Sequence, residues 1–100
     1  MTLFAVLFED DAGHADAVRR QHMPAHLDFL ERNASMITAA GPLRETDGGP
    51  AGGLWLVEAT ERAQVEQLVR EDPFWATGLR PSVRVLAWNQ VFADGARRRT

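Results

Sequence analysis

The alternation of apolar and polar positions divides the chain into four strand-like and two helix-like segments. Residues 2–8 are apolar on both faces and are followed by an acidic cluster, which is typical of a buried strand at the centre of a sheet. The same criteria predict strands at residues 35–43, 54–59 and 82–92. Residues 44–53 contain four glycines and a proline, so we expect a loop there.

Two further segments carry apolar residues at helical spacing. The first covers residues 14–34. Its apolar stripe consists of Met23, Leu27, Leu30 and Ala34, with Phe29 beside it. Because a residue before proline is disfavoured in helical geometry, either this helix kinks at Pro24 or a second helix begins there. The other helix is expected to be capped by Thr60 and to end near Glu71, with Val65, Leu68 and Val69 facing the core.

This β-α-β-β-α-β order is that of the ferredoxin-like fold, an α+β class in which a four-stranded antiparallel sheet has two helices on one face. We expect one domain over residues 1–93 and a frayed tail over residues 94–100. The second sheet face has no cover from this chain, and such an apolar face usually packs against a partner. A homodimer through this open face, forming a dimeric α+β barrel, is therefore predicted. The strands supply large apolar groups to both sheet faces, namely Leu54, Trp55, Leu56, Leu86, Trp88 and Phe92. The open face is expected to carry some of Leu54, Leu56, Leu86, Trp88 and Phe92.

Composition and charge exclude several classes of function. The chain has 100 residues and a formal net charge of -3, which does not suit a broadly basic nucleic-acid surface. It has no cysteine, and all eleven of its cations are arginines, so thiolate and Schiff-base chemistry are excluded. The apolar run over residues 3–8 is too short to span a membrane, and the acids that follow it do not suit a signal peptide. We expect a cytoplasmic protein without nucleic-acid or membrane partners.

Two titratable residues stand at unusual positions. His26 lies at the border of the first helix's apolar stripe, and histidine exchanges protons near neutral pH. It is either a general base facing a cleft or a boundary histidine without a chemical role. Asp72 continues the apolar face of the second helix at its C-terminus, where the helix dipole disfavours a carboxylate. It either orients His26 or caps a turn that begins at Pro73, and one carboxylate can do both.

Residues near this pair supply candidate walls of a small-molecule site. Gly41 and Pro42 end the second predicted strand and could border a cleft. Phe74 either lines an aromatic pocket or belongs to the core. Arg19 and Arg20 lie one to two helical turns before the histidine, where either could hold a substrate carboxylate or simply form a solvated face.

Metal and covalent mechanisms find little support in the sequence. His22 and His26 are four residues apart, a spacing that can place two metal ligands on one helix face, but Pro24 lies between them and no third ligand has a recognisable spacing. No serine sits in a nucleophile elbow. The glycine-rich segment precedes a strand rather than a helix, which does not suit phosphate binding. We expect no metal and no cofactor.

Three short segments, in this order along the chain, resemble one family. They are residues 24–30 (PAHLDFL), residues 39–43 (AAGPL), and residues 71–74 (EDPF) with Gly78 and Leu79 after them. Together with the strand order, they resemble the YciI-like family of small dimeric α+β-barrel proteins over roughly residues 2–92. The resemblance implies a ferredoxin-like fold, a homodimer and a site centred on a His–Asp pair, which by motif position is His26 and Asp72. One branch of that family is similar to a dehydrochlorinase of chlorinated hydroxyquinols.

The residues and the resemblance together predict a cofactor-independent acid–base enzyme for a small cyclic or aromatic acidic metabolite. His26 would move the proton in an elimination, isomerisation or oxygenation, and Asp72 would hold its tautomer. The alternative is a non-catalytic dimeric module that binds a small molecule or a protein. The enzyme hypothesis requires the two side chains within hydrogen-bond reach beside an open cavity.

Overall fold

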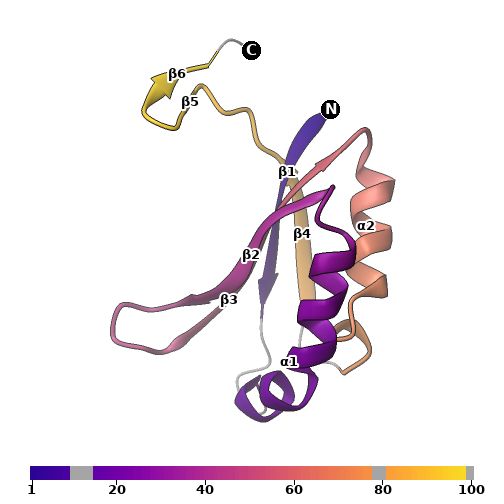
Figure 1. Ribbon diagram of the computed structural model, residues 1–100. Coiled ribbons are helices and arrows are strands. Elements are labelled where there is room, and N and C mark those ends of the chain that lie inside the picture. Colours follow the sequence, from indigo (N-terminus) through magenta and orange to yellow (C-terminus); the bar gives the residue numbers. More distant parts are fainter. Residues whose placement is uncertain (10–14, 78–80, 99–100) are drawn as a thin grey trace.

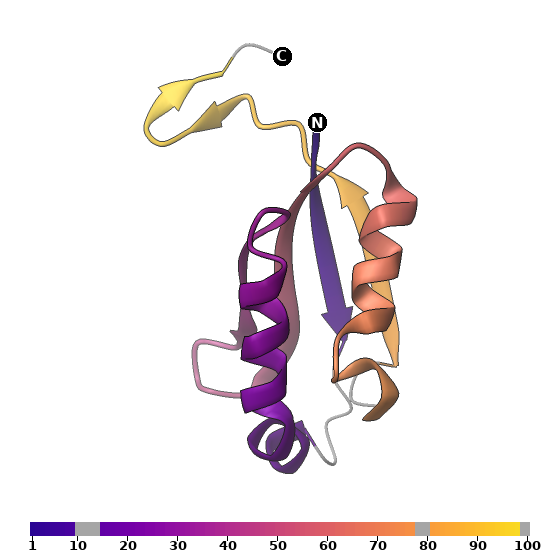
Figure 2. The ribbon, with the colours of Figure 1, turned by 45° about the vertical axis from the view of Figure 1, so that its right-hand side comes forward.

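The computed structural model describes residues 1–9, 15–77 and 81–98, so Gly78, Leu79 and the last two residues of the tail lie outside the described residues. An antiparallel four-stranded sheet carries two helices on one face (Figures 1 and 2). This confirms the predicted α+β, ferredoxin-like fold. Its elements are β1 (Thr2–Glu9), α1 (Ala15–Arg32), β2 (Ile37–Arg44), β3 (Pro50–Ala59), α2 (Arg62–Glu71) and β4 (Ser82–Ala87).

β1 lies inside the sheet, whose strand order is β2-β3-β1-β4. Val6 pairs with Trp55 of β3 on one side and with Val85 of β4 on the other, so these three side chains point to the same face. All three are buried beneath the helices. The helix-covered face therefore forms the core, with Val65, Leu68 and Val69 of α2 packed on it as predicted.

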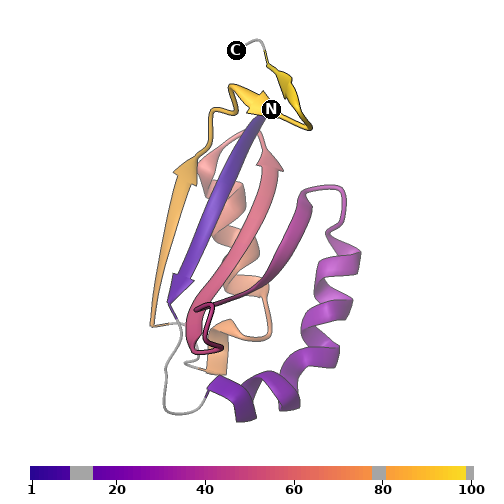
Figure 3. The ribbon, with the colours of Figure 1, turned by 90° about the vertical axis from the view of Figure 1, so that its left-hand side faces the viewer.

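α1 is a single helix that passes through Pro24, so the kinked-helix alternative holds and no second helix begins at the proline. Proline has no backbone N–H, and the carbonyl of Arg20 therefore lacks its usual helical donor. Such a gap bends a helix. Figure 3 shows the first turns of α1 running at an angle to the rest.

The buried face of α1 differs from the predicted apolar stripe. Leu27 is 48% exposed, whereas His26 is 7% and Phe29 3% exposed. The buried face of α1 therefore includes His26 in place of Leu27, the neighbouring residue that the predicted stripe contained. A hydrophobic pattern cannot reveal this, because a polar side chain is buried only when it finds a partner elsewhere in the fold.

The β2–β3 hairpin is longer than the sequence indicates. β2 was expected to end at residue 43 and β3 to begin at residue 54, but β3 begins at Pro50, and Gly52 and Gly53 are strand residues. A Cβ on Gly52 would lie 2.0 Å from the carbonyl oxygen of Phe8, and its φ is +91°. The glycine here permits a close approach of β1 and β3 rather than a loop.

α2 begins one residue later than predicted. Its N-cap is Glu61, and Gln64 forms a capping box by accepting a hydrogen bond from the Glu61 backbone N–H at 3.2 Å. Thr60, the predicted cap, instead donates its hydroxyl to Oε1 of Gln64 at 2.7 Å. Glu61 thus occupies the N-cap position predicted for Thr60, and Gln64 completes the capping box from the N3 position.

The last strand is shorter than predicted and the tail is paired. β4 ends at Ala87, not Phe92, and within it Val83 and Val85 are less exposed than Arg84 and Leu86. Residues 92–97 form a hairpin of β5 (Phe92–Ala93) and β6 (Ala96–Arg97), which stands apart from the sheet in Figure 1. A turn at Asp94-Gly95, where both φ angles are positive, makes this possible.

Candidate active site

The two helices bring together residues that lie 46 positions apart in the chain. His26 sits on the inner face of α1, and Asp72 immediately follows α2, which runs beside α1 on the same sheet face (Figure 2). Nδ1 of His26 lies 2.7 Å from Oδ1 of Asp72, and both residues are buried. A carboxylate can only accept, so Nδ1 donates and the neutral ring has its lone pair on Nε2.

Asp72 has a structural role in addition to this contact. Its Oδ1 also accepts a hydrogen bond from the Phe74 N–H at 3.3 Å, and its backbone carbonyl accepts one from the Trp75 N–H at 2.9 Å. These bonds start the short 3₁₀ turn η1 (Trp75–Thr77). The two alternatives for Asp72 are therefore compatible, and one oxygen serves both contacts.

Aromatic side chains fix the orientation of the imidazole. The Phe74 ring centroid lies 4.5 Å from that of His26, and the Trp55 ring is stacked at 6.4 Å with an interplanar angle of 29°. Phe74 is fully buried and Trp55 is 1% exposed, so neither can move away without opening the core. The imidazole is therefore held by the carboxylate at Nδ1 and by two rings.

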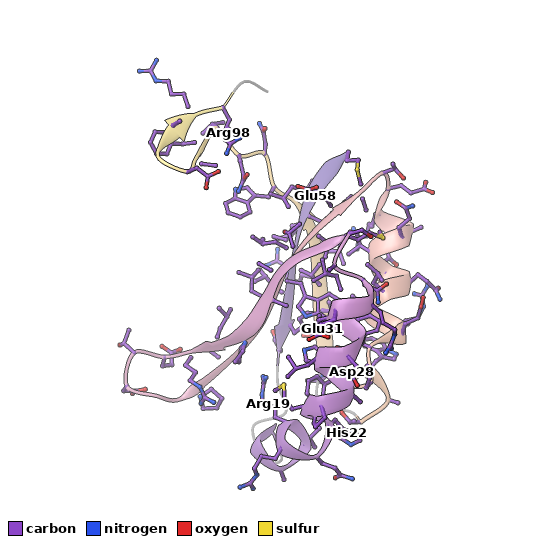
Figure 4. All side chains as sticks on the ribbon, viewed as in Figure 1. Arg19, His22, Asp28, Glu31, Glu58 and Arg98 are labelled. Carbon is purple, nitrogen blue, oxygen red and sulfur yellow. The ribbon has the colours of Figure 1, made fainter. Side chains whose placement is uncertain are left out.

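A pocket of about 100 Å³ reaches His26 between α1 and the β2–β3 hairpin. Three other residues predicted for the site, namely Arg19, Gly41 and Pro42, line it. Asp72 and Phe74 do not line it, so they support the imidazole from behind. Arg19 lies on the side of α1 nearest the hairpin (Figure 4). The remaining lining residues are Met23, Leu27, Leu30, Ala40, Gly53 and Trp55.

Trp55 is a lining residue that the sequence did not assign to the site. The signal for Trp55 was available, because alternation along β3 places it on the same face as Val57 and Ala59. Arg44 lines a second, wider concavity of about 470 Å³ beside the first, which also involves Arg20. Nothing local to Arg44 indicates this, since the contact depends on the hairpin's path past α1.

Within the residues that the structure describes, His22 and His26 belong to no larger cluster of possible metal ligands. His22 contacts Phe74, with ring centroids 6.5 Å apart, and does not line the pocket. Among the described residues, no group of three or more histidine, aspartate or glutamate side chains is placed to hold a metal ion. In the same part of the chain, no helix is long and apolar enough to cross a membrane.

Comparison with known protein families identifies the chain's relatives. The model of the YCII-related domain matches residues 2–89, which is most of the chain. The chain belongs to the YCII family. This confirms the resemblance that the three sequence motifs and the strand order indicated.

One solved structure gives the YCII family context for this site. The chain is similar to the 5-chloro-2-hydroxyhydroquinone dehydrochlorinase TftG from Burkholderia phenoliruptrix AC1100, solved in complex with 2,5-dihydroxybenzoquinone. The identity is 29%, the match covers 87% of this chain and 93% of that one, and the TM-score is 0.76. No curated protein sequence matches the chain.

Proposed function

We propose that this YCII-family protein is a cofactor-independent acid–base enzyme acting on a small aromatic or cyclic acidic metabolite. The observation that carries the proposal is the 2.7 Å contact of His26 with a buried carboxylate, beside a pocket that reaches the imidazole. A base must have its lone pair directed at the substrate, and Asp72 favours this by accepting the Nδ1–H hydrogen bond, which leaves the lone pair on Nε2. TftG, which is similar over nearly its whole length, is a dehydrochlorinase of a hydroquinone, and this supports an aromatic substrate.

Elimination is the reaction class that we propose first, because the similar protein carries it out. When a chlorinated hydroquinone loses HCl, one hydroxyl proton moves to the carbon that bears chlorine, a second is released, and chloride leaves with the C–Cl electron pair. The ring becomes a quinone, and no external oxidant or reductant is needed. A single base that takes a proton from oxygen and returns it to carbon serves this sequence, and Nε2 of His26 is the group in the pocket suited to do so. Isomerisation or oxygenation would begin with the same proton removal.

Arg19 is the residue that we propose to bind the acidic group of the substrate. It lines the same pocket as His26, and the guanidinium fork suits a carboxylate or a phenolate oxygen. Gly41 and Pro42 form the opposite wall, where the backbone of β2 limits the thickness of the ligand. Phe74 contributes by holding the imidazole rather than by lining the pocket.

The test is release of chloride from 5-chloro-2-hydroxyhydroquinone under anaerobic conditions, with brominated and methylated hydroquinones as a panel. We expect the wild type to accelerate halide release and the His26→Gln variant to lose about 10²–10⁴-fold of that rate, the usual contribution of a general base. His22→Gln is the matched control, since it removes a histidine one helical turn away that does not line the pocket. Binding of the panel to the wild type without any turnover would favour the non-catalytic module instead.

We also propose that the protein works as a homodimer through the open sheet face. Leu7 pairs with Leu54, and Ala5 pairs with both Leu56 and Leu86, so the middle of this face is apolar across three strands. Two charged residues, Glu58 and Arg84, lie on the same face beside these apolar residues. Leu86 is 39% exposed there, and no helix of the described chain covers it (Figure 3). An exposed apolar cluster at the middle of a sheet face is normally buried against a partner. A second copy offers the same apolar face.

A further inference from the structure

Arginine residues from two elements surround the mouth of the His26 pocket. Arg19 and Arg20 of α1 and Arg44 at the end of β2 line the wider concavity of about 470 Å³, together with Met23 and Pro42. Three of these five residues, namely Arg19, Met23 and Pro42, also line the pocket at His26. The two cavities are therefore neighbours, the inner one at the imidazole and the outer one at the arginines.

The outer concavity is positively charged in a protein with a formal net charge of -3. Among the described residues, no aspartate or glutamate lines either cavity. Within the described residues, Arg20 and Arg44 form no ion pair, and Arg44 donates only to the carbonyl of Gly48, at 3.4 Å. Arg20 and Arg44 carry like charges in one concavity, so an anion bound between them gains attraction from both.

The size of the inner pocket makes the outer one part of the binding site. An enclosed cavity of ~150 Å³ is needed to hold benzene, whereas the pocket at His26 measures about 100 Å³. A substituted ring whose reacting atom approaches Nε2 therefore extends outward. The outward path leads past Arg19 and Met23 to the concavity lined by Arg20 and Arg44.

We propose that the substrate carries an oxyanionic group, a carboxylate or a phosphate, on an arm that extends from the reacting ring, and that Arg20 and Arg44 bind this group. This inference rests on the proposed function and deepens it by naming the substrate class as a ring with a charged arm. Guanidinium groups bind either oxyanion through paired N–H donors, so carboxylate and phosphate share the chemistry. The two arginines belong to substrate recognition, while proton transfer stays with His26.

Three probes of similar length test the proposal: 3-phenylpropanoate, its neutral amide 3-phenylpropanamide, and 2-phenylethylphosphonate. Their dissociation constants are measured at low salt from the shifts of the His26 ring signals in NMR titrations. We expect the wild type to bind each anion about tenfold more tightly than the amide, as two partly exposed charge-assisted contacts allow. In the Arg20→Gln/Arg44→Gln variant the preference should fall below about threefold. The ranking of carboxylate and phosphonate identifies which oxyanion the site prefers.

Arg70→Gln is the matched control, because Arg70 is an exposed arginine of α2 that lines neither cavity. It should keep the full preference for the anions. Equal binding of the amide and the anions to the wild type, or a preference that survives in the double variant, would overturn the proposal. If the amide shifts the His26 signals without any anion preference, the ring site stands and only the anion site fails. If none of the probes shifts those signals at millimolar concentration, the anion site fails, whereas the proposed function is decided separately by the halide-release assay.

Discussion

The coupling between His26 and Asp72 can be measured through protein stability, independently of any substrate. Replacing Asp72 by asparagine keeps an oxygen that can accept the Phe74 N–H, so the 3₁₀ turn retains its cap. The same change removes the negative charge that accepts the imidazole N–H at 2.7 Å. The substitution therefore separates the pair from the cap, and His26→Ala removes the pair from the other side.

The expected magnitudes follow from the burial of both groups. A hydrogen bond to a charged group contributes about 1.5–3 kcal/mol, against about 0.5–1.5 kcal/mol for a neutral one, so Asp72→Asn should cost about 1–2 kcal/mol in the wild type. In the His26→Ala background the buried carboxylate has lost this partner, and removing its charge should cost nothing or stabilise the protein. The coupling free energy of the double-mutant cycle should thus be at least about 1 kcal/mol.

The four proteins of the cycle are compared by urea denaturation at one chain concentration, so that any self-association affects them alike. The free energy of unfolding of a small protein falls by about 1–3 kcal/mol per molar urea, so the coupling corresponds to a difference on the order of 0.5–1 M in the urea concentration at half unfolding. A coupling below about 0.5 kcal/mol would refute the reasoning, because independent sites are additive within that range. Asp72 would then be a cap and His26 a boundary histidine.

Two further predictions test the fold and its assembly. Gly52→Ala should destabilise the protein by on the order of 3 kcal/mol or more in thermal denaturation, because its Cβ would lie 2.0 Å from the Phe8 carbonyl oxygen. Gly48→Ala is the control and should cost only about 1–2 kcal/mol, because Gly48 has a positive φ but nothing within 4 Å of its Cβ position. Equal losses of stability in the two variants would contradict a close approach of β1 and β3 at Gly52. Sedimentation equilibrium at low micromolar concentration should show twice the chain mass, and Leu86→Lys on the open sheet face should shift the measured mass toward that of the monomer. Trp75→Lys is the control, since Trp75 is equally exposed but lies away from that face, and it should leave the mass unchanged. A monomeric wild type would contradict the dimer.

Much of the fold could be predicted because the sequence marks it locally. Residues 2–8 are apolar on both faces, and the structure places them at the centre of the sheet with strands on both sides. The i, i+3, i+4 spacing of Val65, Leu68 and Val69 gave the buried face of α2. Where local signals compete, the prediction was wrong. The glycine-rich composition around Gly52 indicates a loop, but Gly52 lies in a strand, where it permits the close approach of β1 and β3.

The sequence singles out His26 and Asp72 as candidates, but the contact between them depends on the fold. Asp72 stands out because a carboxylate at the C-terminus of a helix, on its apolar face, needs a compensating contact. That His26 is this contact depends on how two helices pack side by side, which no local pattern contains. The same holds for Arg44, whose place beside Arg20 depends on the path of the β2–β3 hairpin.

The central claim is that Asp72 fixes the tautomer of His26 so that Nε2 presents a lone pair to the pocket. A long-range ¹H–¹⁵N correlation spectrum of the neutral imidazole measures this most directly, with the His26 signals assigned by their loss in His26→Gln. The account predicts a protonated Nδ1 and an unprotonated Nε2 in the wild type. A proton found on Nε2 instead would contradict it, since His26 could not then accept a proton from a ligand in the pocket.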